Sequence, residues 1–209
     1  MEGCTVDFTE EQEHYLRKVM RVTQGSEIKV FDGVNGEWWC RLDVVDKKVV
    51  RGSLKEQRRA MAREPDVWLC FAPVKGEGLE IIVQKGTELG AKILAPIITQ
   101  RTVVKAVRFD RLASISIEAS EQSERLTAPD LLQPQPLSSM LAQWPNDRWL
   151  VVCNENAAGN SCVDVLQKLP KGGKYALVVG PEGGWTVQEL DAFMSIPTVV
   201  ILSLGMFIQ

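Results

Sequence analysis

The segment Val179-Gly180-Pro181-Glu182-Gly183-Gly184-Trp185-Thr186 connects an apolar run to the start of an amphipathic segment. The apolar run, 175–179, is typical of a buried parallel strand. Thr186-Val187-Gln188-Glu189 has the spacing of a capping box, which marks the first turn of a helix. Open α/β sheets bind ligands at such strand-to-helix loops. Taken alone, however, a glycine-rich run is more often a turn, and this one lacks the spacings of phosphate and dinucleotide loops.

Alternation of strands and helices extends outward from this loop. Residues 79–89 carry apolar side chains at helical spacing before Gly90, a suitable C-terminal cap, and Asp110 is expected to cap a helix that continues to about Ser123. Leu79, Ile82, Val83 and Leu89 are the expected inward face of the first helix. Further buried strands are expected at 67–71, 93–98, 149–153 and 199–202. This pattern predicts an α/β layer fold with a parallel sheet.

The first sixty residues predict a different architecture. Thr9-Glu10-Glu11-Gln12 forms another capping box, and apolar side chains follow it at helical spacing. Period-two alternation at 27–31, 37–45 and 49–53, separated by turns, predicts short antiparallel strands. The basic stretch 55–63 lacks a strong apolar rhythm and is expected to hold the domain boundary. We therefore expect a small β-barrel over residues 1–60 and the α/β domain over residues 61–209.

Composition narrows the class of protein. The chain has 209 residues, of which 45% are hydrophobic and 24% charged, as in globular proteins and unlike disordered or coiled-coil chains. No apolar run approaches the roughly 18 residues of a membrane helix, and the first seven residues lack the features of a secretory signal. Five cysteines without Cys-x-x-Cys spacing and a single histidine, His14, argue against disulfides and zinc. We expect a cytoplasmic protein without a metal or a membrane partner.

Charge is distributed unevenly along the chain. Residues 14–63 hold 12 Lys and Arg against 6 Asp and Glu, whereas residues 64–209 hold 12 against 16. A basic N-terminal part suggests contact with a polyanion, although a solvated basic surface explains the counts equally well. Arg17, Lys18 and Arg21 share the edge of one predicted helix and are the candidates for RNA phosphate contacts. His14 is expected to be a packing or surface residue.

Five motifs occur in a fixed order along the chain: Gln84-Lys85-Gly86-Thr87-Glu88-Leu89-Gly90, Gln100-Arg101-Thr102-Val103-Val104-Lys105, Glu118-Ala119-Ser120-Glu121-Gln122-Ser123-Glu124-Arg125, Gly180-Pro181-Glu182-Gly183-Gly184 and Leu204-Gly205. Together they resemble the RsmE family of SPOUT-class 16S rRNA (uracil-N3)-methyltransferases. The segments 14–21 and 31–33 are similar to that family's PUA-like barrel. The resemblance therefore covers nearly the whole chain.

The resemblance implies an S-adenosylmethionine-dependent enzyme that methylates N3 of a uridine in the decoding region of 16S rRNA, within the 30S subunit. It also implies a homodimer whose α/β domain ends in a trefoil knot, an exception to the rule against threaded chains. The cofactor-binding residues that it implies are Asn154, Glu155, Gly180, Pro181, Glu182, Gly183, Leu204 and Gly205.

The implied reaction sets chemical requirements. Uracil N3 carries a proton that must leave before or during methyl transfer, so a carboxylate base and a cation beside the developing anion would accelerate the reaction. Glu88, Glu121 and Arg125 are the candidate catalytic residues, and Arg101 is a second cation that would also contact RNA. Structural roles remain open, because Glu121 could be solvated and Arg125 could neutralise a helix C-terminus.

The chain also departs from the family pattern. Phe207 stands where the family has an arginine, and the following acidic-Thr-Ala segment that closes the knot is absent, so the knot is expected to be incomplete. The family's usual first strand is not evident before Thr9. Two alternatives therefore stay open: an rRNA-binding protein of this fold with impaired catalysis, and a SPOUT methyltransferase that acts on another RNA.

Overall fold

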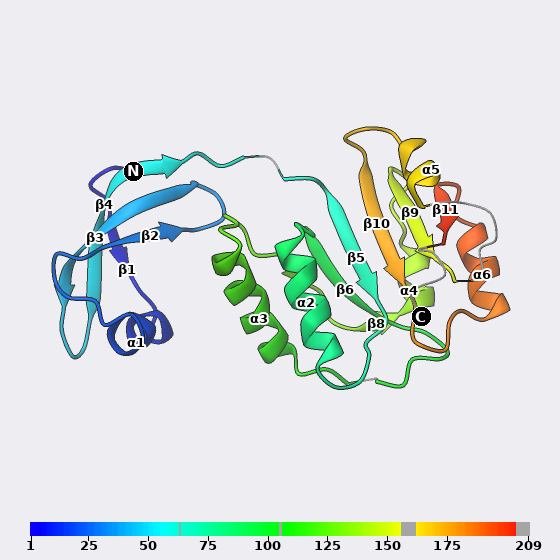
Figure 1. The fold of residues 1–209 in the computed structure, drawn as a ribbon, viewed down its shortest axis with the longest axis horizontal. Helices are drawn as coiled ribbons and strands as arrows, with labels where there is room; N and C mark the ends of the chain where they lie inside the picture. Colours follow the sequence, from blue (N-terminus) through cyan, green and yellow to red (C-terminus); the bar gives the residue numbers. More distant parts are fainter. Residues whose placement is uncertain (63, 105, 156–161, 204–209) are drawn as a thin grey trace. The chain divides into compact units, whose positions relative to one another are not determined.

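The computed structural model describes residues 1–62, 64–104, 106–155 and 162–203. The chain divides into two compact units, Met1–Arg63 and Glu64–Gln209, and each is described by itself (Figure 1). The family-implied knot depends on residues after Ser203, so it lies outside the described residues. No helix in the described ranges is long and apolar enough to cross a membrane.

The N-terminal unit combines one helix with an antiparallel sheet. Helix α1 (Glu10–Lys18) begins at the predicted capping box, in which Thr9 and Gln12 each accept a hydrogen bond from the other's backbone N–H. The sheet has the order β1-β4-β3-β2. Its strands are β1 (Thr5–Asp7), β2 (Glu27–Phe31), β3 (Glu37–Val45) and β4 (Val50–Arg59). The buried core of the unit consists of Leu16, Ile28, Cys40, Leu42, Val50 and Leu54.

Three features of this unit differ from the sequence prediction. A first strand is present, because β1 pairs with residues 51–53 of β4. Strand β4 continues into the basic stretch as far as Arg59, and there Arg58 and Arg59 both donate to the buried carboxylate of Glu37. The sheet is an open path, with no β1–β2 pairing among the described residues, so the barrel is not closed by backbone hydrogen bonds.

The C-terminal unit contains the predicted parallel sheet, with the order β11-β9-β10-β5-β6-β7. All of its neighbouring strands run parallel, and the two-residue strand β8 pairs with the end of β6. The strands are β5 (Val67–Phe71), β6 (Ile93–Ile98), β7 (Asp130–Leu131), β8 (Gln135–Pro136), β9 (Arg148–Cys153), β10 (Lys174–Val179) and β11 (Val199–Leu202).

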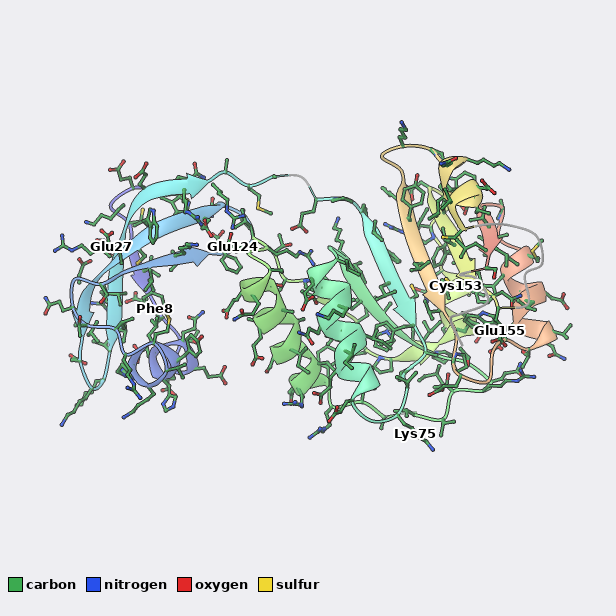
Figure 2. The ribbon with its side chains drawn as sticks, viewed as in Figure 1. Phe8, Glu27, Lys75, Glu124, Cys153 and Glu155 are labelled. Carbon is green, nitrogen blue, oxygen red and sulfur yellow. The ribbon has the colours of Figure 1, made fainter. Side chains whose placement is uncertain are left out.

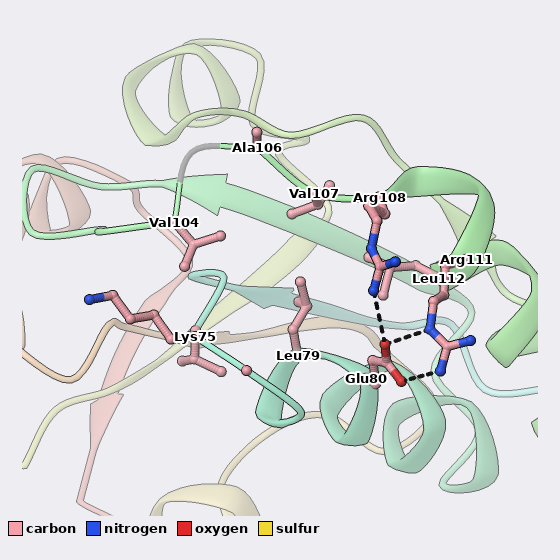
Figure 3. A pocket seen from close by; sticks show the side chains of 11 residues that line it. Lys75, Leu79, Glu80, Val104, Ala106, Val107, Arg108, Arg111 and Leu112 are labelled. Carbon is pink, nitrogen blue, oxygen red and sulfur yellow. Dashed lines mark hydrogen bonds and ion pairs between the residues drawn. The ribbon is translucent and has the colours of Figure 1, made fainter.

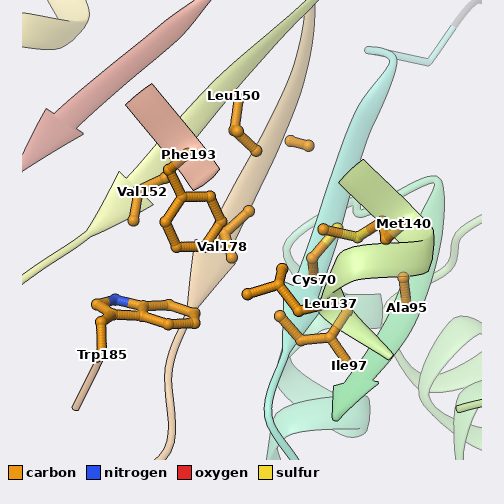
Figure 4. Packing of buried hydrophobic residues seen from close by; sticks show 11 residues of the cluster. Cys70, Ala95, Ile97, Leu137, Met140, Leu150, Val152, Val178, Trp185 and Phe193 are labelled. Atoms are coloured by element: carbon orange, nitrogen blue, oxygen red, sulfur yellow. The ribbon is translucent and has the colours of Figure 1, made fainter. Parts of the chain in front are cut away.

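Helices cover both faces of this sheet. Leu69 and Phe71 point to the face covered by α2 (Gly78–Glu88) and α3 (Phe109–Gln122), and α5 (Cys162–Gln167) packs against Cys153 and neighbouring strands. Cys70 points to the other face, where α4 (Leu137–Ala142) and α6 (Val187–Met194) complete the main core (Figure 4). Since both faces are buried, the central parts of the longer strands are apolar, as is typical of a parallel sheet, and charged residues such as Arg148 and Lys174 stand at the strand beginnings.

Two helix details correct the sequence prediction. Leu89 is 87% exposed instead of facing the core, because α2 ends at Glu88 and the chain turns at Gly90, where φ is +88°. Helix α3 begins with Phe109, and Asp110 lies in its first turn instead of capping it. Neither change alters which strands the helices connect.

Candidate functional site

The glycine-rich loop leaves β10 at the carboxyl-terminal edge of the sheet and is anchored there by Trp185. The buried indole Nε1 donates to the carbonyl oxygen of Cys153, at 2.8 Å, and its ring packs edge-on against Phe193. A Cβ on Gly180 would stand 2.9 Å from the Trp185 ring. The loop after β10 is thus fastened to the end of β9, and Gly180 is required for that contact.

A second tie joins this loop to the segment after β6. The Arg101 guanidinium Nη1 donates to the carbonyl oxygen of Gly183 at 2.5 Å. A Cβ on Gly183 would lie 3.3 Å from the side chain of Arg101, and one on Gly184 would lie 3.3 Å from Oε1 of Glu155. Gly184 also has a φ of +69°, which favours glycine. The loop therefore offers bare backbone between Arg101 and Glu155.

Glu189, on α6, also connects the segment after β6 to the end of the glycine-rich loop. Its side chain is buried, and its carboxylate accepts from the backbone N–H of Gln100 at 2.8 Å and from the backbone N–H of Thr186 at 2.9 Å. Thr186 in turn caps α6, as the capping box predicts. One carboxylate thus holds the segment after β6 and the start of α6 in a fixed relation.

The described cofactor candidates gather at this edge. Asn154 and Glu155 directly follow β9, where the Asn154 backbone N–H donates to the carbonyl oxygen of Leu202. Segment 180–183 directly follows β10, and the loop approaches Cys153 through Trp185 and Glu155 through Gly184. Figure 2 labels Cys153 and Glu155 at the end of β9. Leu204 and Gly205 lie outside the described residues. Glycine backbone flanked by Arg101 and Glu155 is a suitable cradle for a small polar ligand.

Comparison with known proteins gives the family. A family model for the RNA methyltransferase domain matches residues 62–208, and a model for the RNA methyltransferase PUA domain matches residues 8–54. A relative from Bacillus subtilis strain 168, Ribosomal RNA small subunit methyltransferase E, is 31% identical over 201 residues, covering 91% of this chain and 78% of the relative. The chain belongs to the RsmE family of RNA methyltransferases.

Other proteins of the RsmE family are similar to this chain over comparable lengths, in sequence and in fold. The Ribosomal RNA small subunit methyltransferase E of Rickettsia conorii is 28% identical over 192 residues, covering 92% of this chain and 78% of its own. A crystal structure of the protein of that name from Neisseria gonorrhoeae, bound to S-adenosyl methionine, superposes with a TM-score of 0.88 at 28% identity. That comparison covers 100% of this chain and 86% of the other.

The RsmE motif that ends in Arg125 lies at the opposite edge of the sheet. Arg125 Nη1 donates to the carbonyl oxygens of Thr87 and Ala91, and Nη2 donates to the carboxylate of Glu64 at 2.7 Å and to Thr127. Thr87 and Ala91 flank the turn that precedes β6, and Glu64 precedes β5. These residues mark the amino-terminal edge, which a strand of six residues separates from the other edge by roughly 20 Å.

Glu121 and Glu88 lie at this amino-terminal edge too, since each is at the last turn of a helix that runs back along the sheet. Partial burial, and then the charge of Glu118, raise the pKa of Glu121. Glu88 forms an ion pair with Lys85 at 2.7 Å. The structure therefore does not bring these three catalytic candidates to the glycine loop of their own chain, and their predicted role stays a prediction.

The predicted RNA contacts on α1 divide into two kinds. Arg17 donates to Glu13 at 3.2 Å and to the carbonyl oxygen of Asp46, and Glu13 is buried and accepts from the backbone N–H of Val50. Lys18 and Arg21 are exposed, and the described residues offer them no ion-pair partner. Arg17 thus has a structural role, in neutralising the buried Glu13, that Lys18 and Arg21 do not share. His14 is exposed, and its role stays a prediction.

Sequence reasoning did not assign Trp185 or Glu189 to the site. Trp185 ends the quoted loop, and Glu189 completes its capping box, so both were visible locally. Their contacts with Cys153 and Gln100 span 32 and 89 residues, respectively, and carry no local signal. Among the described residues, no group of three or more His, Cys, Asp or Glu side chains could hold a metal ion.

Proposed function

We propose that this chain transfers a methyl group from S-adenosylmethionine to N3 of a uridine in the decoding region of 16S rRNA. Support for the general reaction comes from the family, whose named relatives are small-subunit rRNA methyltransferases. The observation that carries the cofactor assignment is the glycine loop held between Arg101 and Glu155, in a chain that superposes on a relative bound to S-adenosyl methionine.

The cofactor, when bound, supplies an electrophilic methyl group on a positively charged sulfur. In this proposal the backbone of 180–184, with Asn154 and Glu155, binds the cofactor. Gly183 and Gly184 allow close approach because neither carries a Cβ. Arg101 keeps the loop in place and presents positive charge beside the RNA, where a phosphate or a developing uracil anion would be stabilised.

The N3 proton of uracil requires an acceptor. Glu121 meets the chemical need, because its raised pKa makes it a better base than an ordinary carboxylate. Glu121 lies at the edge of its own sheet opposite the glycine loop. The proposal therefore includes a homodimer in which Glu121 of one subunit acts at the glycine loop of the other. Arg125 would act there by positioning, because its donors are engaged with Glu64, Thr87, Ala91 and Thr127.

Isothermal titration with S-adenosylmethionine tests the cofactor assignment. Wild-type protein should bind, and Gly183→Val should bind at least tenfold more weakly, because a branched side chain would collide with Arg101. Gln188→Ala, an exposed change on α6, is the control and should bind as wild type does. Equal affinity of Gly183→Val and wild type would show that the loop is only a turn.

If wild type does not bind S-adenosylmethionine but binds 16S rRNA, the chain is an rRNA-binding protein of this fold. If it binds the cofactor and methylates a different RNA, the substrate assignment is wrong while the cofactor assignment stands. The two open alternatives are therefore separated by two measurements.

A further inference from the structure

A cavity of about 240 Å³ opens at the same edge of the sheet as the glycine loop, on the side of α2 and α3 (Figure 3). The loop after β5, residues Val104 and Ala106–Arg108, and the first turns of α2 and α3 surround it. Apolar side chains of Val74, Leu79, Val107 and Leu112 form part of its wall. None of the described cofactor candidates, which are Asn154, Glu155 and residues 180–183, lines this cavity, so we treat it as separate from the proposed cofactor site.

Charged side chains at the cavity are mostly basic. The described lining includes three basic side chains, Lys75, Arg108 and Arg111, and one carboxylate, Glu80, and Lys75 points away from that carboxylate (Figure 3). Arg111 holds that carboxylate through two hydrogen bonds, of 2.6 and 2.7 Å, whereas Arg108 is 3.9 Å from it and its side chain is 82% exposed. Lys75 is exposed, without an ion-pair partner among the described residues. Among the described residues that line the cavity, Lys75 and Arg108 are therefore the cations most available to an anionic ligand.

Glu80 is committed to these arginines. The hydrogen bonds from Arg111 keep the pKa of Glu80 below its usual value. The carboxylate thus stays ionised near neutral pH and does not accept a proton. A ligand in this cavity would be bound and oriented, not deprotonated.

Size decides which part of a ligand fits. Pockets that enclose drug-sized ligands measure roughly 300–1,000 Å³. A cavity of about 240 Å³ is smaller than that range, so it suits one base or one nucleotide unit and not a whole cofactor. Apolar walls beside exposed cations match a nucleotide, which has a flat base and a negatively charged phosphate.

One segment of chain links the cavity to the glycine loop. Arg101 donates to the carbonyl oxygen of Gly183, and Val104, Ala106, Val107 and Arg108, which follow closely in the chain, line the cavity. An RNA strand that contacts both Arg101 and Arg108 would pass both places. The cavity is thus positioned to hold a nucleotide near the one that meets the glycine loop.

We propose that this cavity binds one unstacked nucleotide of the RNA substrate, adjacent in the strand to the methylated base. The base packs against Val74, Leu79, Val107 and Leu112, and the phosphate contacts Lys75 and Arg108. The substrate class rests on the proposed function, but nucleotide binding by the cavity can be measured without methyl transfer.

Fluorescence anisotropy with a labelled single-stranded oligouridylate, titrated with the full chain at several salt concentrations, tests this. Lys75→Ala with Arg108→Ala should bind at least tenfold more weakly and flatten the slope of log K against log salt by about 1.4, since each single-strand phosphate contact contributes about 0.7. Lys168→Ala with Lys171→Ala removes the same charge from exposed positions outside the cavity and should leave the slope unchanged.

A third variant tests the apolar walls. Ala106→Trp at the cavity mouth keeps every cation and should weaken oligouridylate binding at least fivefold with an unchanged slope. S-adenosylmethionine affinity, titrated separately, should be the same in all variants. Equal effects of the two double variants, or wild-type binding by Ala106→Trp, would overturn the cavity assignment. If the wild-type protein neither binds S-adenosylmethionine nor methylates rRNA, the proposed function is wrong, whatever the cavity binds.

Discussion

Arg101 and Gly183 are separated by 82 residues, yet the Arg101 guanidinium donates to the Gly183 carbonyl oxygen at 2.5 Å. This bond fixes the most exposed part of the glycine loop against the segment that follows β6. A charged donor makes the bond stronger than one between neutral groups. The loop is therefore held in one conformation before a ligand arrives.

Removing this bond should weaken cofactor binding. Arg101→Ala is expected to lower S-adenosylmethionine affinity about tenfold, because a hydrogen bond to a charged group is worth roughly 1.5–3 kcal/mol and this one is exposed. Gln100→Ala is the control, since only the backbone of Gln100 contacts Glu189. Isothermal titration measures both. Unchanged affinity of Arg101→Ala would mean that the loop holds its shape unaided.

Glu189 should contribute mainly to stability. Glu189→Ala removes the acceptor of the Gln100 and Thr186 N–H groups, so the free energy of unfolding should fall by about 2–3 kcal/mol. The control is Gln188→Ala, an exposed neighbour on α6 with an expected change below about 0.5 kcal/mol. Urea denaturation followed by tryptophan fluorescence compares the two. Equal free energies of unfolding for the two variants would show that Glu189 does not stabilise the site.

Arg125 should stabilise the fold whether or not it influences catalysis. Arg125→Ala removes the cation that pairs with the Glu64 carboxylate, which keeps only the Thr127 hydroxyl as a donor among the described residues, and removes one donor from each of the Thr87 and Ala91 carbonyl oxygens. We expect a loss of about 2–4 kcal/mol. Lys85→Ala, which breaks the exposed pair with Glu88, should cost less than about 1 kcal/mol. A wild-type unfolding free energy in Arg125→Ala would contradict the structural role.

The Arg125–Glu64 pair should also be sensitive to acid. Burial raises the pKa of Glu64, but hydrogen bonds from Arg125 and Thr127 outweigh it, so the pKa lies below 4.5. A lowered carboxyl pKa contributes stability above pH 4.5 that is lost as pH falls through the folded-state value. The stability difference between wild type and Arg125→Ala should be full at pH 7 and narrow below pH 4.5. A difference that stays constant to pH 3 would contradict the ion pair.

The basic residues of α1 should separate into stability and RNA binding. Lys18→Ala with Arg21→Ala should flatten the salt slope of rRNA binding by about 1.5 without changing thermal stability. Arg17→Ala should lower the stability of the N-terminal unit, because the buried Glu13 loses its ion-pair partner while it keeps the hydrogen bond from the Val50 N–H. Anisotropy and thermal unfolding read the two effects. If Arg17→Ala flattens the salt slope of rRNA binding and Lys18→Ala with Arg21→Ala does not, Arg17 is the residue that contacts RNA and the assignment is wrong.

Local sequence signals predicted the elements well. The capping boxes at Thr9 and Thr186 are both formed, and the apolar runs became the parallel strands. The local signals missed features that depend on contacts between residues far apart in the sequence. Strand β1 exists because residues 51–53 pair with it, and β4 continues through basic residues because Glu37, far away in sequence, neutralises Arg58 and Arg59.

The site was predicted in part. The sequence predicted that 154–155 and 180–183 each follow a strand, and the structure adds that these two strands, β9 and β10, pair side by side and in parallel. Grouping Glu121 and Arg125 with the loop ignored chain direction: a helix after a parallel strand returns to the amino-terminal edge, so residues at its end lie far from the loop. That rule could have predicted their placement. The Arg101 bond to Gly183 could not, because no spacing rule encodes it.

Transfer of a labelled methyl group tests the central claim most directly. Purified protein, S-adenosylmethionine labelled in its methyl group and 30S subunits from cells that lack this modification would be incubated together, and the rRNA would then be digested and mapped by mass spectrometry. The account predicts one labelled nucleotide, a 3-methyluridine in the decoding region of 16S rRNA, and none with Gly183→Val. A label on a ribose, on another base or on no nucleotide would contradict it.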